Sequence, residues 1–169
     1  IKKSSTGIIG ASLLSPFYNT SAKSYSRILG SNDRIILAFQ GLGRRFPGLL
    51  DSSLKMQNVG IKYFCDVMDK QIDKANKRYF DLTQEKVNSE KNIHKIIDDK
   101  DVDALIIATP DHWHTYAACK GMEAGKHIYL EKPCSHNLRE SELLVNYQNY
   151  YNKSVQMGNQ QRSSYETAD

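Results

Sequence analysis

The 169-residue chain lacks any cysteine pattern that would hold a metal or a disulfide framework. Its three cysteines, Cys65, Cys119 and Cys134, are scattered, and no two of them stand at CxxC spacing. Disulfide frameworks and zinc sites normally show an even or closely spaced set. We therefore expect reduced thiols that pack as small hydrophobic side chains.

A concentrated positive charge is also missing from most of the chain. The net charge is +4, but residues 1–48 hold seven Lys/Arg and one Asp, whereas residues 49–169 carry a balance of −2. A nucleic-acid-binding domain needs a basic patch or stripe on its folded body. This distribution argues against nucleic acid as a partner.

The N-terminal region has no apolar run long enough to cross a membrane. Lys2 and Lys3 precede a short, weakly apolar segment that Ser15-Pro16 ends. A charged stretch before a short apolar one is typical of an export signal, and this one resembles the tail of a twin-arginine signal. We expect residues 1–33 to be a signal remnant and linker, and the mature protein to be periplasmic or otherwise exported and free of the membrane. A disordered tail is the alternative.

Strands and helices alternate from Arg34 onward. Apolar runs predict strands at residues 35–39, 61–65, 104–108, 127–130 and 155–157, with at most a short edge strand within 80–88. Helical spacing predicts helices near residues 49–54, 69–79, 91–99, 112–124 and 138–151. This alternation is typical of an α/β fold with a doubly wound parallel sheet and helices on both faces.

A glycine-rich turn follows the first predicted strand. Gly41-Leu42-Gly43 occupies the place of a dinucleotide-binding turn, where Gly41 permits the tight turn and Gly43 lets backbone N–H groups approach a pyrophosphate. The third glycine of that motif is replaced by Phe46. Either the helix packs more loosely there, or Gly48 supplies the close approach. An ordinary loop is the alternative interpretation.

An acidic residue, Asp66, ends the second predicted strand, 25 residues after Gly41. Its carboxylate could accept both hydroxyls of an adenosine ribose and would repel a 2′-phosphate, which favours NAD over NADP. Arg44 or Arg45 could reach a phosphate, so NADP stays open. Asp66 could instead cap the next helix, although Asp69 is better placed for that role.

Two further strand ends carry polar and ionisable groups. Thr109-Pro110 and a pair of histidines follow one strand, and Glu131-Lys132-Pro133 follows the next. Adjacent strand ends of this kind form ligand sites in open α/β sheets. Lys132 could donate a proton to a developing alkoxide or polarise a carbonyl, unless it is an ordinary surface lysine.

The histidine pair does not predict a metal site. His112 and His114 are two positions apart at a helix start, so they would not face one ion, and no third ligand is apparent. We therefore expect no bound metal. Trp113, between them, is expected to pack.

Together these segments, with Cys65-Asp66-Val67, Gly125 to Pro133 and Gly158-Asn-Gln-Gln-Arg162, resemble the N-terminal domain of the Gfo/Idh/MocA oxidoreductases, the glucose–fructose oxidoreductase and inositol dehydrogenase family. The resemblance implies a Rossmann-like NAD(P)-binding domain at residues 34–165. It also implies that residues 166–169 begin the family's C-terminal α/β domain, which this chain lacks.

The resemblance also implies roles for residues at the strand ends. It places Thr109 and Pro110 beside the nicotinamide half of the cofactor and the segment with Glu131 and Pro133 at the nicotinamide ribose. His114 matches a position of the family motif and is expected among the cofactor-binding residues. It presents Lys132 to the substrate hydroxyl as the catalytic group and brings the amide of Gln160 to the nicotinamide. A cis peptide bond at Pro133 is a further expectation.

The function that follows is the cofactor domain of a nicotinamide-dependent oxidoreductase that transfers a hydride from a sugar or polyol hydroxyl. The intact enzyme is expected to be a homo-oligomer. An NAD-using glycosidase on the same scaffold and a non-catalytic dinucleotide-binding remnant remain alternatives. Because the family's second domain completes the active site, we expect the 169-residue chain alone to bind cofactor without turnover.

Overall fold

Six short strands form one parallel sheet in the computed structural model, which describes residues 34–160. The strands are β1 (Ile35–Gln40), β2 (Val59–Cys65), β3 (Asn88–Glu90), β4 (Ala104–Ile107), β5 (His127–Glu131) and β6 (Val155–Gly158). Their order is β3-β2-β1-β4-β5-β6, and every neighbouring pair is parallel. From β1 the chain adds β2 and β3 on one side, and then crosses over to add β4, β5 and β6 on the other side. At such a switch point, between β1 and β4, a crevice opens at the carboxyl ends of the strands. The predicted doubly wound fold is confirmed.

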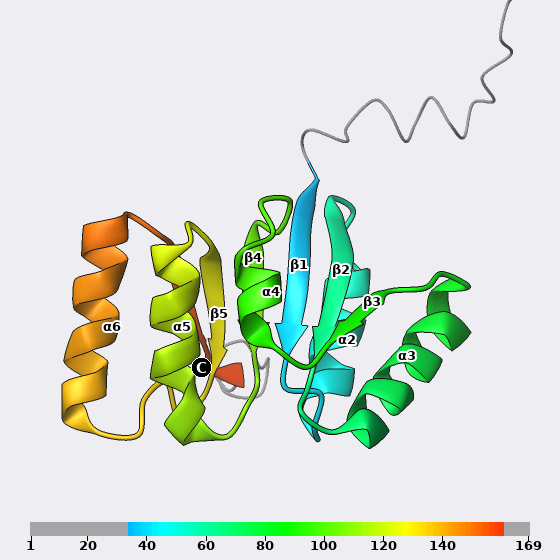
Figure 1. Ribbon diagram of the computed structural model, residues 1–169, viewed down its shortest axis with the longest axis horizontal. Coiled ribbons are helices and arrows are strands. Elements are labelled where there is room, and N and C mark those ends of the chain that lie inside the picture. Colours follow the sequence, from blue (N-terminus) through cyan, green and yellow to red (C-terminus); the bar gives the residue numbers. More distant parts are fainter. Residues whose placement is uncertain (1–33, 161–169) are drawn as a thin grey trace, which may run out of the picture. The chain divides into compact units, whose positions relative to one another are not determined.

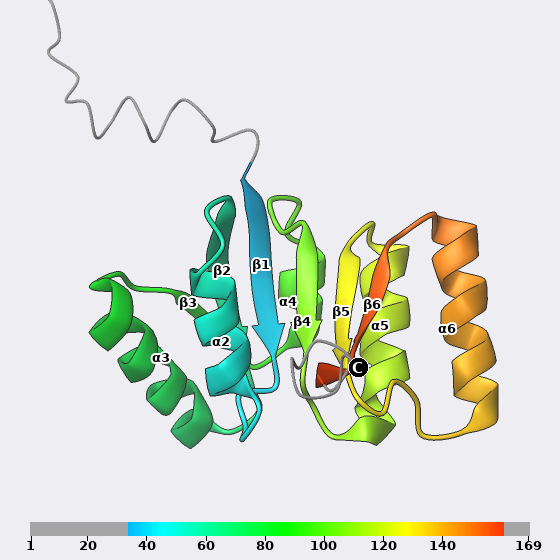
Figure 2. The ribbon, with the colours of Figure 1, turned by 180° about the vertical axis from the view of Figure 1, so that it is seen from behind.

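Helices cover both faces of this sheet (Figures 1 and 2). One face carries α2 (Phe46–Leu54) and α3 (Asp69–Thr83). The other carries α4 (Ile93–Ile97), α5 (His114–Glu123) and α6 (Leu138–Tyr151), with a 3-10 turn, η2 (Asp111–Trp113), leading into α5. Within residues 34–160, none of the helices combines the length and apolar character that a membrane crossing requires. The predictions for residues 1–33 and 161–169, including the export signal and the start of a second domain, lie outside the described residues.

Two hydrophobic clusters, one on each face, hold the sheet. Leu37 and Phe39 of β1 pack toward α2 and α3, whereas Ala38 between them joins the cluster under α4, α5 and α6. Successive strand residues point to opposite faces, so a strand buried on both sides must be apolar throughout. This explains why the central strands appear in the sequence as continuous apolar runs.

An aromatic cluster packs α2 against the sheet. The Phe46 ring meets Phe39 and Phe64 edge-to-face, with centroids 5.5 and 5.0 Å apart, and the Phe46 side chain is buried. Gly48 is exposed, and a Cβ there would meet the Arg45 side chain at 3.3 Å. The expectation of looser packing, or of a close approach through Gly48, is therefore wrong: the ring takes the place of the missing glycine.

The segment around residues 80–88 also differs from the prediction. Helix α3 continues to Thr83 and ends at Gln84, whose φ of 59° is left-handed, so the edge strand β3 falls at Asn88–Glu90 instead. The buried Tyr79 ring, 5.6 Å from Phe64, anchors the last turns of the helix. The end of this helix was not predicted, because most of its side chains are exposed and its apolar residues show no clear helical spacing.

Candidate functional site

The turn after β1 brings two strand ends into direct contact. Gly41 has a φ of +84°, and a Cβ there would lie 2.6 Å from the backbone carbonyl atoms of Ala108 at the end of β4. Only glycine fits this approach. At Gly43, by contrast, an added Cβ would meet nothing within 4 Å, so its backbone is open to a ligand. Leu42 between them is buried and fixes the turn.

Asp66 ties this turn to the end of β2. Its Oδ2 accepts a hydrogen bond from the Leu42 N–H at 2.8 Å, and its Oδ1 accepts one from the Met68 N–H at 3.0 Å. The N-cap of α3 is Met68, without a side-chain cap, so neither Asp66 nor Asp69 caps this helix. Asp69 is exposed and pairs with Lys91 at 2.7 Å. A carboxylate has about four acceptor positions, which leaves Asp66 capacity for a bound hydroxyl.

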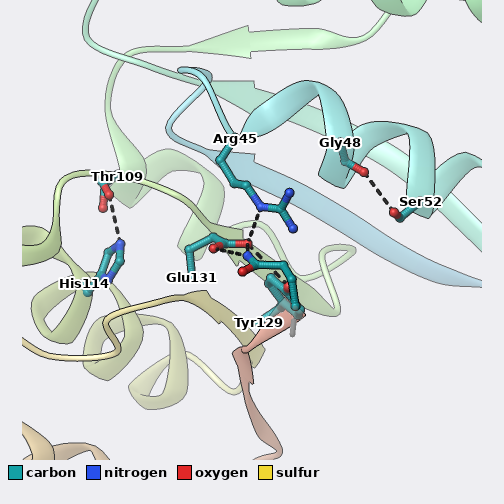
Figure 3. A network of polar contacts seen from close by, with 8 residues as sticks. Arg45, Gly48, Ser52, Thr109, His114, Tyr129 and Glu131 are labelled. Atoms are coloured by element: carbon teal, nitrogen blue, oxygen red, sulfur yellow. Dashed lines mark hydrogen bonds and ion pairs between the residues drawn. The ribbon is translucent and has the colours of Figure 1, made fainter. Parts of the chain in front are cut away.

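A polar network gathers on Glu131 at the end of β5 (Figure 3). The buried carboxylate accepts hydrogen bonds from Arg45 Nε at 2.8 Å and from Gln160 Nε2 at 2.8 and 3.1 Å, and Tyr129 Oη lies 3.5 Å away. The hydrogen bond from Arg45 to Glu131 raises the pKa of the Arg45 guanidinium above its ordinary value. The network joins the glycine turn, β5 and the segment after β6. Arg44 and Arg45 are both exposed, but Arg45 is engaged with this carboxylate.

His114 connects the ends of β4 and β5. Its buried ring lies between two carbonyl oxygens: Nδ1 is 2.6 Å from Pro133 O, and Nε2 is 2.9 Å from Thr109 O. Figure 3 shows the contact with Thr109. A neutral imidazole donates from one nitrogen only, so the tautomer decides which carbonyl receives the hydrogen. His114 therefore holds the two strand ends in place. The Lys132–Pro133 peptide bond is cis, as predicted, and Lys132 itself is exposed.

A cavity of about 570 Å³ opens beside the glycine turn, within the usual range for small-molecule sites. Gly41, Gly43, Asp66, Thr109 and Pro110 line it, so the structure brings these predicted residues together. Glu131, Lys132 and Gln160 do not line this cavity; they lie beyond it, around the ends of β5 and β6.

Two side chains that line the cavity each contain a buried polar atom without a partner. Gln40 Oε1 and Thr109 Oγ1 are shielded from solvent and have no hydrogen-bond partner within the described part of the chain. Buried polar groups almost always find a partner, so these two side chains hold unused hydrogen-bonding capacity next to the cavity. The backbone at Gly43, which is open to the cavity, is the part of this lining that a nucleotide can reach directly.

Sequence reasoning missed an apolar and aromatic wall of the cavity. Val67, Met68, Trp113 and Tyr116 all line it and all are exposed, Trp113 to 51%. Trp113, expected to pack, does contact the Tyr116 ring at 5.8 Å between centroids, but about half of its surface stays exposed. Its place at the end of a short 3-10 turn, rather than inside a helix, keeps the indole at the surface.

The cysteines are free thiols, as expected. Cys65 is buried, and Cys119 and Cys134 are half-buried. Burial raises the pKa of the Cys65 thiol to about 12 and that of Cys119 to about 11, so neither is a ready nucleophile at neutral pH. No group of three or more potential metal ligands occurs among residues 34–160.

A parallel sheet in this strand order, with a glycine turn after β1 and an acidic residue after β2, defines the Rossmann class of dinucleotide-binding domains. More particularly, the chain belongs to the Gfo/Idh/MocA family, described as "oxidoreductase family, NAD-binding Rossmann fold", whose model matches residues 43–159. The family resemblance found in the sequence is thus confirmed.

One protein of known description is similar to two thirds of this chain. A glycosyl hydrolase family 109 protein from Shewanella pealeana is 29% identical over 117 residues, which are 67% of this chain and 26% of that protein. The chain thus spans about a quarter of that relative's length.

Solved structures share the fold. A putative NADPH-dependent oxidoreductase from Desulfitobacterium hafniense superimposes with a TM-score of 0.71 at 21% identity, over 80% of this chain and 37% of that one. The WlbA dehydrogenase from Bordetella pertussis, in complex with NADH and UDP-GlcNAcA, gives 0.66 at 19% identity, over 77% and 36%.

Proposed function

We propose that this chain is the cofactor-binding part of an NAD-dependent oxidoreductase that acts on a sugar or polyol hydroxyl. The observation that carries the proposal is the set of polar groups at neighbouring strand ends. The set runs from Asp66, directly after β2, to Glu131, the last residue of β5, and Lys132. Between these ends lies the open backbone of Gly43. A dinucleotide laid across the carboxyl edge of the sheet would meet these groups in turn.

Each of these groups has a part in the proposal. The backbone at Gly43 and the start of α2 receive the pyrophosphate, and Asp66 receives the hydroxyls of the adenosine ribose. Glu131 receives the nicotinamide ribose. Lys132 accepts the proton of the reacting hydroxyl when the substrate is oxidised and returns it in the reverse direction. The cofactor, when bound, takes up the hydride. Because Asp66 is a carboxylate, NAD is favoured over NADP; the solved structures described above include proteins named for either cofactor.

A second candidate function is an NAD-using glycosidase on the same scaffold. The relative from Shewanella pealeana, described as a glycosyl hydrolase family 109 protein, favours it. Such an enzyme would return the hydride to the substrate and release a sugar without net change in cofactor. Lys132 serves either reaction, so product analysis decides: net NADH formation from a sugar supports the oxidoreductase, and glycoside cleavage without NADH accumulation supports the glycosidase.

Binding is tested first, by calorimetric titration of the 169-residue chain with NAD and NADP. The informative variant is Gly43→Val, because an added side chain meets no protein atom within 4 Å of the Cβ and would instead fill the ligand's space. We expect at least about a 10-fold loss of NAD affinity, equivalent to about 1.4 kcal/mol. Ser52→Val, on the exposed side of α2 and outside the cavity, is the control and should bind NAD like wild type.

Two results would contradict the proposal. Absence of binding to both dinucleotides by the folded wild-type chain would remove its basis. Unchanged affinity in Gly43→Val would show that any binding occurs away from the glycine turn.

A further inference from the structure

Arg45 contacts a strand end that is not adjacent to its own in the sheet. It lies shortly after β1, whereas its partner Glu131 is the last residue of β5, and β4 lies between these two strands. The Arg45 side chain therefore reaches across the carboxyl end of β4, with Nε 2.8 Å from Glu131 Oε1 (Figure 3). This ion pair links the glycine turn to the strand end that carries Lys132.

The carboxylate of Glu131 depends on Arg45 for its positive partner. Only 6% of the Glu131 side chain is exposed, and an ionised carboxylate at such a buried place is stable only when it is paired and hydrogen-bonded. Within residues 34–160, Arg45 is the only cationic side chain that forms an ion pair with it. Gln160 and Tyr129 contribute neutral groups. The charge of this strand end is thus balanced by one arginine from the glycine turn.

The two oxygens of the Glu131 carboxylate are used unequally. Oε1 accepts from Arg45 Nε at 2.8 Å and from Gln160 Nε2 at 3.1 Å, and Tyr129 Oη lies 3.5 Å away. Among the described residues, Oε2 accepts from Gln160 Nε2 alone, at 2.8 Å. Since a carboxylate has about four acceptor positions, Oε2 keeps capacity for a further donor. Arg45 therefore decides which of the two oxygens stays available.

Gly158 of β6 leaves the room that this network needs. It pairs with Glu131 in the sheet, and a Cβ there would lie 2.5 Å from Tyr129 Oη and 3.0 Å from Glu131 Oε1. A larger residue would displace the tyrosine or the carboxylate. The network is thus closely packed on the side of β6 as well as on the side of α2, and the Glu131 side chain has little freedom to turn.

We propose that Arg45 is a positioning residue that holds Glu131 Oε1 so that Oε2 faces a hydroxyl of the nicotinamide ribose, an inference that rests on the proposed function. Arg45 acts on the cofactor through Glu131 and not through contact with the diphosphate, although it stands beside the glycine turn. A guanidinium suits this role, because it stays charged at every accessible pH and presents its donors in a rigid plane.

Calorimetric titration of the 169-residue chain with NAD and with ADP tests this role. ADP carries the adenosine and the diphosphate but lacks the nicotinamide ribose. Arg45→Gln should weaken NAD by about 10-fold, the order expected when a hydrogen bond to a charged group is lost. It should leave ADP affinity nearly unchanged, because the charge of Arg45 is already paired with Glu131. Arg139→Gln, at an exposed ion pair on α6, is the charge-matched control and should bind both ligands like wild type.

A double-mutant cycle shows whether Arg45 acts through Glu131. In a Glu131→Gln background, Arg45→Gln should cause little further loss of NAD affinity, because the carboxylate that Arg45 holds is no longer there. If Arg45 bound the diphosphate itself, the losses of the two single variants would multiply, and ADP affinity would fall as well. Thermal melting checks that every variant folds. If Arg45→Gln does not fold, Arg45→Lys carries the same comparison with a smaller expected loss, since it keeps the charge.

The outcomes separate this inference from the proposed function. The positioning role would be overturned by unchanged NAD affinity in Arg45→Gln, by equal losses for NAD and ADP, or by multiplying losses in the double variant. Each of these results would leave the proposed function standing. No binding of NAD or NADP to the folded wild-type chain would overturn both.

Discussion

At the scale of single residues, binding and chemistry fall on different strand ends and should separate on mutation. Asp66 holds the Leu42 N–H at 2.8 Å and is proposed to select NAD by its charge. Asp66→Asn keeps the shape and removes the charge, so the preference for NAD over NADP should narrow by about 1–3 kcal/mol, measured as the ratio of dissociation constants. Asp69→Asn, which changes an exposed carboxylate three residues away, should leave the ratio unchanged. If the ratio of the NAD and NADP dissociation constants stays the same in Asp66→Asn, then Arg44 or another group selects the cofactor.

Lys132 is expected to affect turnover and not cofactor binding. It is exposed after β5, next to the buried Glu131, and does not line the cavity beside the glycine turn. In an enzyme of the proposed function that contains this chain, Lys132→Ala should lower turnover by about 10² or more while cofactor affinity stays nearly constant, as expected when the group that exchanges a proton with the substrate is lost. Steady-state kinetics and calorimetry measure the two effects. Lys120→Ala, at a surface pair with Glu123, is the control. A loss of cofactor affinity instead would make Lys132 a cofactor ligand.

At the scale of elements, Phe46 shows how a helix can keep its place after a sequence motif is lost. Its buried ring fills the contact between α2 and the sheet, so Phe46→Ala should lower the free energy of unfolding by about 3–5 kcal/mol, in urea or thermal unfolding. Phe46→Gly, which restores the third glycine, should be at least as destabilised, because the aromatic cluster would lose its centre. A stable Phe46→Gly variant would mean that the glycine packing is available after all. Phe80→Ala, exposed on α3, should change stability little.

The same scale shows what the sequence could predict. Strands β1, β4 and β5 were predictable because burial on both faces demands continuous apolar runs. Strand β3 was placed wrongly because its three residues, Asn88-Ser89-Glu90, carry no apolar signal. The positions of Asp66 and Glu131 at strand ends were predictable from the turn and strand patterns. Their partners were not: Arg45 and Glu131 are 86 positions apart, and no local spacing encodes that contact. The exposure of Trp113 likewise depends on how η2 leads into α5.

At the scale of the whole described body, a polar cluster near the start of β4 should make stability depend on acidity. The Lys62 ammonium, 2.7 Å from Asp99, is the main cause that lowers the pKa of this carboxyl to about 2, and the Tyr63 hydroxyl donates to it at 2.8 Å. The buried Lys126 ammonium donates to the Asp99 carbonyl at 2.6 Å and so joins this loop to the start of β5.

Folding lowers the pKa of Asp99, and this direction sets how the stability of the fold changes with pH. A carboxyl whose pKa is lowered by folding stabilises the fold above its ordinary pKa, and this contribution is lost as the pH falls from about 4 towards 2. The Lys62 and Asp99 side chains are partly exposed, so solvent screening reduces this contribution to the free energy of unfolding to about 1–2 kcal/mol.

Asp99→Asn should therefore be less stable than wild type by about that amount at pH 7 in urea unfolding, and the difference should shrink steadily below pH 4. Asp81→Asn breaks an exposed pair with Lys77 and should change stability by less than about 0.5 kcal/mol at either pH. A difference for Asp99→Asn that stays constant down to pH 3 would mean that the side chain acts through its shape and hydrogen bonds, and not through its charge.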